Sequence, residues 1–290
     1  MIWKKEPANN WLVGLDAHRR LDKPSKHPHY GPWYSDDGED GVINYLFDFI
    51  NDEFKHAVDL GSYHGYGGSQ IRHVADKYSW NTTEFDSAIN EPMHPNVRQV
   101  LITPETICSK LDEHNTPKEF DLLSLDIDSV DYNVLESILN GGFKPNVAIV
   151  EFNPLFAHDE LYVRSLDPPL RKNGTSWYGA SLGAFENLMN NNNYTLIHVF
   201  GKVDVDTNGN TIPENSLEIN NALFINNKFI TKDTIISSID KLHPTPWIES
   251  HKKHNPEFGD DYYDYKSFMI NSTEFRGKQY ENTLFKKLDK

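Results

Sequence analysis

The stretch FDLLSLDIDSVDYNVLESILNGGFKPNVAIVEFNP, residues 120–154, decides the fold of this chain. Its first apolar run, residues 122–125, predicts a buried β-strand because no charge interrupts it. Three acids, Asp126, Asp128 and Asp131, follow this run closely. Carboxylates therefore gather where the predicted strand ends.

The second half of the stretch repeats this arrangement. A helix-like segment at residues 132–139 leads to another apolar run, residues 147–150, which is followed by Glu151. In an open parallel sheet, ligands bind in the crevice outside the carboxyl ends of the strands. The stretch therefore indicates a small-molecule site lined by acids.

The preceding part of the chain reads as helix, strand, glycine turn and helix. Apolar residues at helical spacing predict a helix over residues 40–51, and residues 57–60 form a short apolar run. The turn GSYHGYGG, residues 61–68, separates this run from a helical pattern at residues 70–78. This order predicts a βα unit with a glycine loop between its strand and its helix.

The same alternation continues along the chain. We expect helices over residues 104–113 and 181–190, and strands over residues 82–85, 97–102, 194–200 and 221–225. Alternating strands and helices with apolar strands are typical of a parallel sheet that is covered on both faces. We therefore predict an α/β fold with a doubly wound, mostly parallel sheet and helices on both faces.

The two ends of the chain have a different composition. Residues 1–35 are rich in His, Pro and charge without a clear period, which predicts an irregular N-terminal extension. Residues 231–290 combine prolines with the acidic aromatic run DDYYDY, and we expect them to form a C-terminal appendage packed on the main domain. The α/β domain is then expected to span residues 36–230.

Composition limits the classes of partner and compartment. The 28 Lys and Arg residues are outnumbered by 43 Asp and Glu residues, and the net charge of -15 repels nucleic-acid phosphates and anionic lipids. No run approaches the roughly 18 apolar residues of a membrane span. The single cysteine, Cys108, is typical of a reducing compartment. We expect a cytoplasmic protein that binds neither nucleic acid nor membrane; the sequence does not predict its oligomeric state.

The glycine turn is a candidate ligand-binding element. Asp59 precedes Gly61 and Gly65, whose lack of a side chain lets a ligand approach the backbone. The glycines do not follow the GxGxxG spacing, so an ordinary strand-to-helix turn is an alternative. His64, inside the turn, is either a base with a pKa near neutral or a loop histidine without a catalytic task.

Two acids after the next strand are candidates for ribose binding. Glu84 and Asp86 follow about 20 residues after the start of the glycine turn, where nucleotide-binding α/β folds place an acid that accepts hydrogen bonds from ribose hydroxyls. Alternatively, both acids are solvated surface charges in a Thr-rich segment and bind no ligand.

The acids Asp126, Asp128 and Asp131 have three interpretations. They position a nucleotide-like cofactor and its acceptor, they chelate a divalent cation as a DxD pair does in glycosyltransferases, or they stabilise the start of the next helix. Helix capping suits Asp131 best. Because acids in a dry crevice repel one another, we expect at least one of the three to have a raised pKa or a cation nearby.

Other motifs do not predict a metal centre. Residues 204–209, DVDTNG, imitate the start of a calcium loop, but the twelfth position is Asn215 instead of Glu, so we expect a turn. The 13 histidines show no HExxH spacing, and a P-loop motif does not occur. We therefore expect no resident metal and no P-loop NTPase.

Six segments taken in order resemble the FkbM-like class I S-adenosylmethionine-dependent methyltransferases. They are GEDGVINYLF (38–47), AVDLGSYHG (57–65), FDLLSLDIDSVDY (120–132), VAIVEFNP (147–154), GASLGAFENL (179–188) and NALFI (221–225). The resemblance covers residues 34–230 and is most specific at LSLDIDSVDY with VEFNP. Family members commonly read LSIDIDGNDYW there, and this chain departs from that pattern at Ser129, Val130 and Asn133.

The resemblance implies a seven-stranded sheet with an antiparallel last strand, S-adenosylmethionine as cofactor, and methyl transfer to an oxygen of a small molecule or glycan. The expected cofactor-binding residues are Asp59, Gly61, Gly65, Glu84, Asp86 and Asp126. The ribose-binding acid of the family falls on Glu84. Asp86 is its rival, because the chain is about two residues shorter there than the family pattern.

We expect Asp128, His64 or Glu151 to orient or deprotonate an acceptor hydroxyl for in-line attack on the sulfonium methyl. One alternative is a metal-dependent glycosyltransferase that uses Asp126 and Asp128 as a DxD pair. Another is a non-catalytic binding protein on the same fold, which the departures from the family pattern favour.

Overall fold

The computed structural model of the chain describes residues 34–35, 39–50, 53–88, 94–153, 161–166, 179–201, 220–229 and 285–288. The predicted N-terminal extension and C-terminal appendage therefore lie almost entirely outside the described residues. The predicted turn at residues 204–209 also lies outside them.

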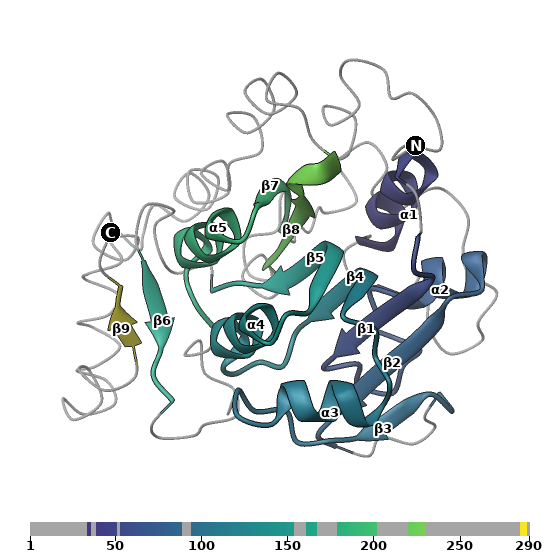
Figure 1. The fold of residues 1–290 in the computed structure, drawn as a ribbon, viewed down its shortest axis with the longest axis horizontal. Coiled ribbons are helices and arrows are strands. Elements are labelled where there is room, and N and C mark those ends of the chain that lie inside the picture. The colour runs from purple at the N-terminus through teal and green to yellow at the C-terminus, as the bar shows by residue number, and fades with distance from the viewer. Residues whose placement is uncertain are drawn as a thin grey trace, which may run out of the picture.

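The centre of the molecule is a seven-stranded sheet in the order β3-β2-β1-β4-β5-β8-β7 (Figure 1). Its strands are β1 (His56–Leu60), β2 (Asn81–Asp86), β3 (Val97–Gln99), β4 (Glu119–Leu125), β5 (Lys144–Glu151), β7 (Tyr194–Gly201) and β8 (Asn220–Asn226). The pairs from β3 to β5 are parallel, and β8 is antiparallel to both β5 and β7. The predicted mostly parallel sheet with an antiparallel last strand is confirmed; β8 lies between β5 and β7.

Helices cover both faces of this sheet (Figure 1). They are α1 (Glu39–Phe49), α2 (Arg72–Tyr78), α3 (Ile107–Glu113), α4 (Asp131–Asn140) and α5 (Leu182–Asn191). Apolar residues of α1 and α2 cluster with Ala57 and Leu122, whereas those of α3, α4 and α5 cluster with the next residues along the same strands, Val58 and Leu123. Successive strand side chains point to opposite faces, so each apolar strand contributes to both cores.

The predicted elements occur with boundaries that differ by three residues or fewer. β3 is the shortest of the predicted strands, because the backbone N–H of Val100 already binds the carbonyl of Asp86 and the chain then turns. α3 begins at Ile107 after a turn in which Ile107 donates to the Thr103 carbonyl. Residue patterns locate a helix or strand well, but its ends depend on such local hydrogen bonds.

A small second sheet was not predicted. It pairs β6 (Tyr162–Arg164) with β9 (Phe285–Lys287) in antiparallel register. Each strand has three residues, and more than a hundred residues of chain separate them, so no local pattern indicates the pairing. β8 is followed by a short 3-10 helix, Asn227–Phe229.

Candidate functional site

The strand order places a candidate site at the carboxyl ends of β1 and β4. The chain proceeds from β1 outward through β2 and β3, and it then crosses back to β4 on the other side of β1. Such a reversal is the topological switch point at which open α/β sheets bind ligands. The carboxyl ends of β1, β2, β4 and β5 lie at this edge of the sheet (Figure 1).

The glycine turn begins in direct contact with the end of β4. Gly61 has a φ of +93°, and a Cβ atom there would lie 1.7 Å from the carbonyl oxygen of Asp126. The N–H groups of Gly61 and Ser62 both donate to the carbonyl of Phe85, at 2.9 and 3.1 Å. Only glycine fits this approach, because any side chain would collide with the backbone. The ends of β1, β2 and β4 are therefore joined at this glycine.

Polar side chains below the turn hold it on the sheet. The Ser69 hydroxyl donates to Oδ2 of Asp59 at 2.9 Å, and the Ser124 hydroxyl donates to Oε1 of Gln70 at 3.2 Å. Burial, with the neighbouring charge of Glu84, raises the pKa of Asp59 to about 7. The structure thus places Asp59 in a buried network under the turn.

Glu84 is also buried, with an exposed fraction of 0%. Its Oε2 forms an ion pair with the guanidinium of Arg72, and its Oε1 accepts a hydrogen bond from the Thr82 hydroxyl at 2.5 Å. Nε of Arg72 donates to the carbonyl of Gly65 at 3.0 Å. Arg72 therefore connects Glu84 to the glycine turn and covers the carboxylate that was expected to bind ribose.

Asp86 lies at the carboxyl end of β2 and is partly exposed. Its Oδ2 accepts the N–H of Tyr63 at 2.8 Å, and its Oδ1 accepts the N–H of Ala88 at 2.7 Å. Each carboxylate oxygen has a further lone pair, so Asp86 can accept more hydrogen bonds at the rim of the sheet. Of the two acids expected near ribose, Asp86 is the one at the strand end.

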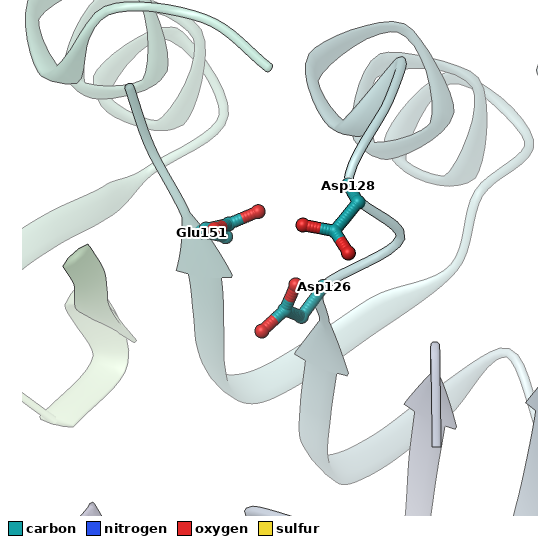
Figure 2. A group of neighbouring side chains, drawn as sticks. All are labelled: Asp126, Asp128 and Glu151. Carbon is teal, nitrogen blue, oxygen red and sulfur yellow. The ribbon is translucent and has the colours of Figure 1, made fainter. Parts of the chain in front are cut away.

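Three of the predicted site residues converge at the ends of β4 and β5. Asp126 directly follows β4, Asp128 lies in the next loop, and Glu151 ends β5 (Figure 2). One carboxylate oxygen from each lies within 4.8 Å of the others. We call these three residues the acidic cluster. Asp128 has a φ of +56°, a left-handed conformation that Asp tolerates better than most residues, so its position depends on the shape of this loop.

Asp131 supports the loop that carries the acidic cluster. It is the first residue of α4, and its carboxylate accepts the N–H groups of Ile127 at 2.8 Å and Ser129 at 3.0 Å. Its charge lies in the first turn of α4, where a negative charge at the helix start was expected, but the side chain makes no capping bond to the helix, because both bonds go back to the preceding loop. Burial raises the pKa of Asp131 to about 6. One of the three acids thus has the expected raised pKa, with burial as the main cause.

His64 lies among the aromatic side chains of the glycine turn. It is buried, its ring centroid is 4.2 Å from that of Tyr63, and its Nδ1 accepts the N–H of Tyr66 at 3.4 Å. It does not belong to the acidic cluster. The structure therefore separates the three residues expected near the acceptor into two places, with Asp128 and Glu151 together and His64 apart.

Sequence reasoning missed several polar residues of this edge. Arg72 is one of them. Its position gives a usable signal, because it lies four residues after the glycine turn and 12 residues before Glu84, with which it pairs. Asn221 at the start of β8 pairs with Glu151 across the sheet, and its Nδ2 donates to Oε1 of Glu39 at 3.1 Å. Arg164 on β6 is the last, and its surrounding sequence has no periodic pattern.

Comparisons of the chain with models of protein families and with curated proteins found no match. Within the described part of the chain, no helix has the length and apolarity that a membrane span needs.

Proposed function

We propose that the chain is an S-adenosylmethionine-dependent methyltransferase of the FkbM-like type, acting on an oxygen of a small molecule or glycan. The observation that supports this proposal most is the contact of the glycine turn with the end of β4, next to the acidic cluster. The glycine turn and the acidic cluster then border the same switch point. The turn lets a nucleoside cofactor approach the backbone, and the carboxylates lie where its acceptor would bind. We expect it to act in the cytoplasm.

The glycine turn and Asp86 form the cofactor side of the proposed site. The resemblance implies that backbone groups at Gly61 and Gly65 contact the methionine end of the cofactor. Gly65 is buried, with its N–H on the carbonyl of Ser62 and its carbonyl on Arg72, so the proposal relies on Gly61. Asp86 accepts hydrogen bonds from the ribose hydroxyls, because it lies at the end of β2 with acceptor capacity left. Glu84 instead holds Arg72 and the turn, because its carboxylate is fully buried and forms an ion pair with Arg72.

The acidic cluster forms the acceptor side. Asp128 or Glu151 accepts the proton of an acceptor hydroxyl as its oxygen attacks the methyl carbon in line with the sulfur. The new O–C bond forms while the C–S bond breaks, and the electron pair of the C–S bond stays on sulfur. The products are a methyl ether and S-adenosylhomocysteine. Asp126 separates the two sides, and holding both reactants in line supplies much of the rate. His64 remains a candidate base on the side of the glycine turn.

Calorimetric titration with S-adenosylmethionine tests the cofactor assignment. We expect the wild-type chain to bind it, and D86A to weaken binding by about 10- to 100-fold through lost ribose hydrogen bonds. D112A is the matched control, since Asp112 is an exposed acid on α3 that pairs with Lys118. Absence of binding heat for the wild-type chain, or equal affinities for the wild-type chain and D86A, contradicts the proposal.

One observation favours a second function, metal-dependent glycosyl transfer. The three carboxylates of the acidic cluster lie within 4.8 Å of one another, a spacing that suits a hard divalent cation. This function predicts manganese-dependent binding of a nucleotide sugar that D128N removes. Methyl transfer from a labelled donor to hydroxylated acceptors, undiminished by a chelator, excludes it together with a purely non-catalytic role.

A further inference from the structure

Arg164 is a buried charged residue to which the proposed mechanism assigns no task. Its side chain is 2% exposed, and its backbone N–H donates to the carbonyl of Gly179 at 3.1 Å. The N–H of Gly179 donates in turn to the carbonyl of Ser129 at 2.8 Å. A Cβ atom on Gly179 would lie 3.8 Å from the carbonyl oxygen of Glu151. Arg164 is thus attached to the loop and to the strand end that carry the acidic cluster.

The guanidinium of Arg164 has one occupied and one unoccupied edge. Nη1 contacts the Ser129 hydroxyl at 3.4 Å. Within the residues that the structure describes, Nε and Nη2 have no hydrogen-bond partner. These two nitrogens form one edge of the planar group, and their parallel N–H bonds match the two oxygens of a carboxylate or a phosphate.

A purely structural role explains this arrangement poorly. Asp131 attracts Arg164 electrostatically, but its carboxylate accepts the backbone N–H groups of Ile127 and Ser129 and no hydrogen bond from Nε or Nη2 of Arg164. If Arg164 only compensated the charge of Asp131, two of its buried nitrogens would stay without acceptors. Buried donors without acceptors raise the free energy of the folded chain. An oxyanion that accepts from Nε and Nη2 would satisfy both donors.

An anionic ligand at this edge of the sheet has to overcome the negative charge of the acidic cluster. Three carboxylates repel any negatively charged molecule that approaches the ends of β4 and β5. A guanidinium held through Ser129 on the loop that carries Asp128 lowers that repulsion and also orients the ligand through two parallel bonds. An uncharged acceptor would need no such group.

We propose that the Nε and Nη2 edge of Arg164 binds an oxyanion of the acceptor, so that the methyl group is transferred to a hydroxylated molecule that carries a carboxylate or a phosphate. This inference rests on the proposed methyl transfer, since it names the substrate class of the same site. Arg164 acts as a specificity-determining residue, while Asp128 or Glu151 receives the proton.

Titration of the full chain with glucose, glucuronate and glucose 6-phosphate tests the inference, with and without S-adenosylhomocysteine. We expect one of the anionic probes to bind at least about tenfold more tightly than glucose. The glucuronate and glucose 6-phosphate titrations distinguish a carboxylate from a phosphate. R164Q should remove the preference, and R164K, which keeps the charge without the paired N–H groups, should restore only part of it. R98Q, at an exposed arginine of β3, should change nothing.

The results that overturn the inference are distinct from those that overturn the function. Equal binding of all three probes, including no binding of any, refutes the oxyanion site, as does an anion preference that survives in R164Q. If R164Q is unfolded, R164K decides the same question. R164K could instead bind S-adenosylhomocysteine more weakly and the probes with unchanged affinity. Arg164 would then bind the carboxylate of the cofactor, which refutes its proposed role in acceptor binding. Failure of the wild-type chain to bind S-adenosylhomocysteine, with probe preference intact, refutes only the methyl transfer.

Discussion

The two ends of β4 carry acids in opposite surroundings. Near its start, Asp121 is buried among donors: Oδ2 accepts the N–H groups of Phe54 at 3.1 Å and His56 at 3.4 Å, and Oδ1 accepts Nδ2 of Asn146 at 2.9 Å. After its end, Asp126 belongs to the acidic cluster, in which carboxylates lie close to other carboxylates.

This difference indicates that Asp121 has a structural role, whereas the acidic cluster is suited to binding a ligand. Donors around Asp121 offset part of the loss of water around its charge. Carboxylates facing one another raise the free energy of the folded chain, and a bound proton, cation or polar substrate lowers it. Substitutions at the two ends should therefore change stability differently.

The largest expected effect concerns Gly61, where the carboxyl edge is assembled. G61A places a Cβ atom 1.7 Å from the Asp126 carbonyl oxygen, so we expect a loss of at least about 4 kcal/mol in the free energy of unfolding. G142A is the matched control, because Gly142 has a φ of +80° with no atom within 4 Å of the added Cβ. It should lose only about 1 kcal/mol in urea unfolding. Equal losses would contradict the close approach.

The second effect compares the two ends of β4 directly. D121A leaves three donors without their acceptor, and we expect it to lower the free energy of unfolding by about 3 kcal/mol. D126A relieves repulsion in the acidic cluster, so its unfolding midpoint should stay near or above that of the wild type. Urea titrations of both variants at one pH measure this. A larger loss in D126A than in D121A would reverse the comparison.

The third effect concerns the two acids of β2. E84Q removes the buried charge partner of Arg72 and leaves the exposed Asp76, and we expect it to lower the free energy of unfolding by about 2 kcal/mol. D86N keeps one acceptor oxygen at the rim, so it should lose less than about 1 kcal/mol while weakening S-adenosylmethionine binding. Thermal unfolding and titration of both variants check the division. Strong binding loss with intact stability in E84Q would return the ribose role to Glu84.

The fourth effect is a pH dependence with different windows at the two ends of the sheet. Burial raises the pKa of Asp121 to about 6 and, with the charge of Glu84, that of Asp59 to about 7, both from 3.8. A raised carboxyl pKa contributes stability below the unfolded value, and this contribution is lost as the pH rises through the folded value. As the pH rises from about 3.8, the free energy of unfolding of the wild type should therefore fall relative to that of D121N until about pH 6. Relative to that of D59N it should fall until about pH 7.

These windows are read from differences between wild type and variant. Burial lowers the pKa of His56 to about 4, so His56 contributes in the opposite direction: its effect reduces stability as the pH falls below 6.5. The His56 contribution is common to the proteins compared and cancels in the difference. Flat difference curves between pH 4 and pH 7 would contradict the raised pKa values of Asp59 and Asp121.

The sequence predicts the sheet well because its signals are local. Runs without a charged residue mark β4 and β5, and the glycines of residues 61–68 mark a turn after β1, so both features are legible without coordinates. The convergence of Asp126 and Glu151 also follows, since parallel strands end at one edge.

What the sequence does not predict depends on contacts between distant residues. Glu84 and Asp86 have equivalent positions in the pattern, and only the ion pair with Arg72 distinguishes them. The bonds of Asp131 to the preceding loop require the loop conformation itself, so a capping rule misplaces them. Arg164 lies on a three-residue strand whose partner is at the other end of the chain.

A density map of the full chain with S-adenosylhomocysteine tests the central claim most directly. We predict density at the carboxyl ends of β1 and β4, with ribose hydroxyls on Asp86, the amino-acid end beside Gly61, and the sulfur directed toward the acidic cluster. Density at any other place, or none at a concentration that saturates binding, would contradict the account.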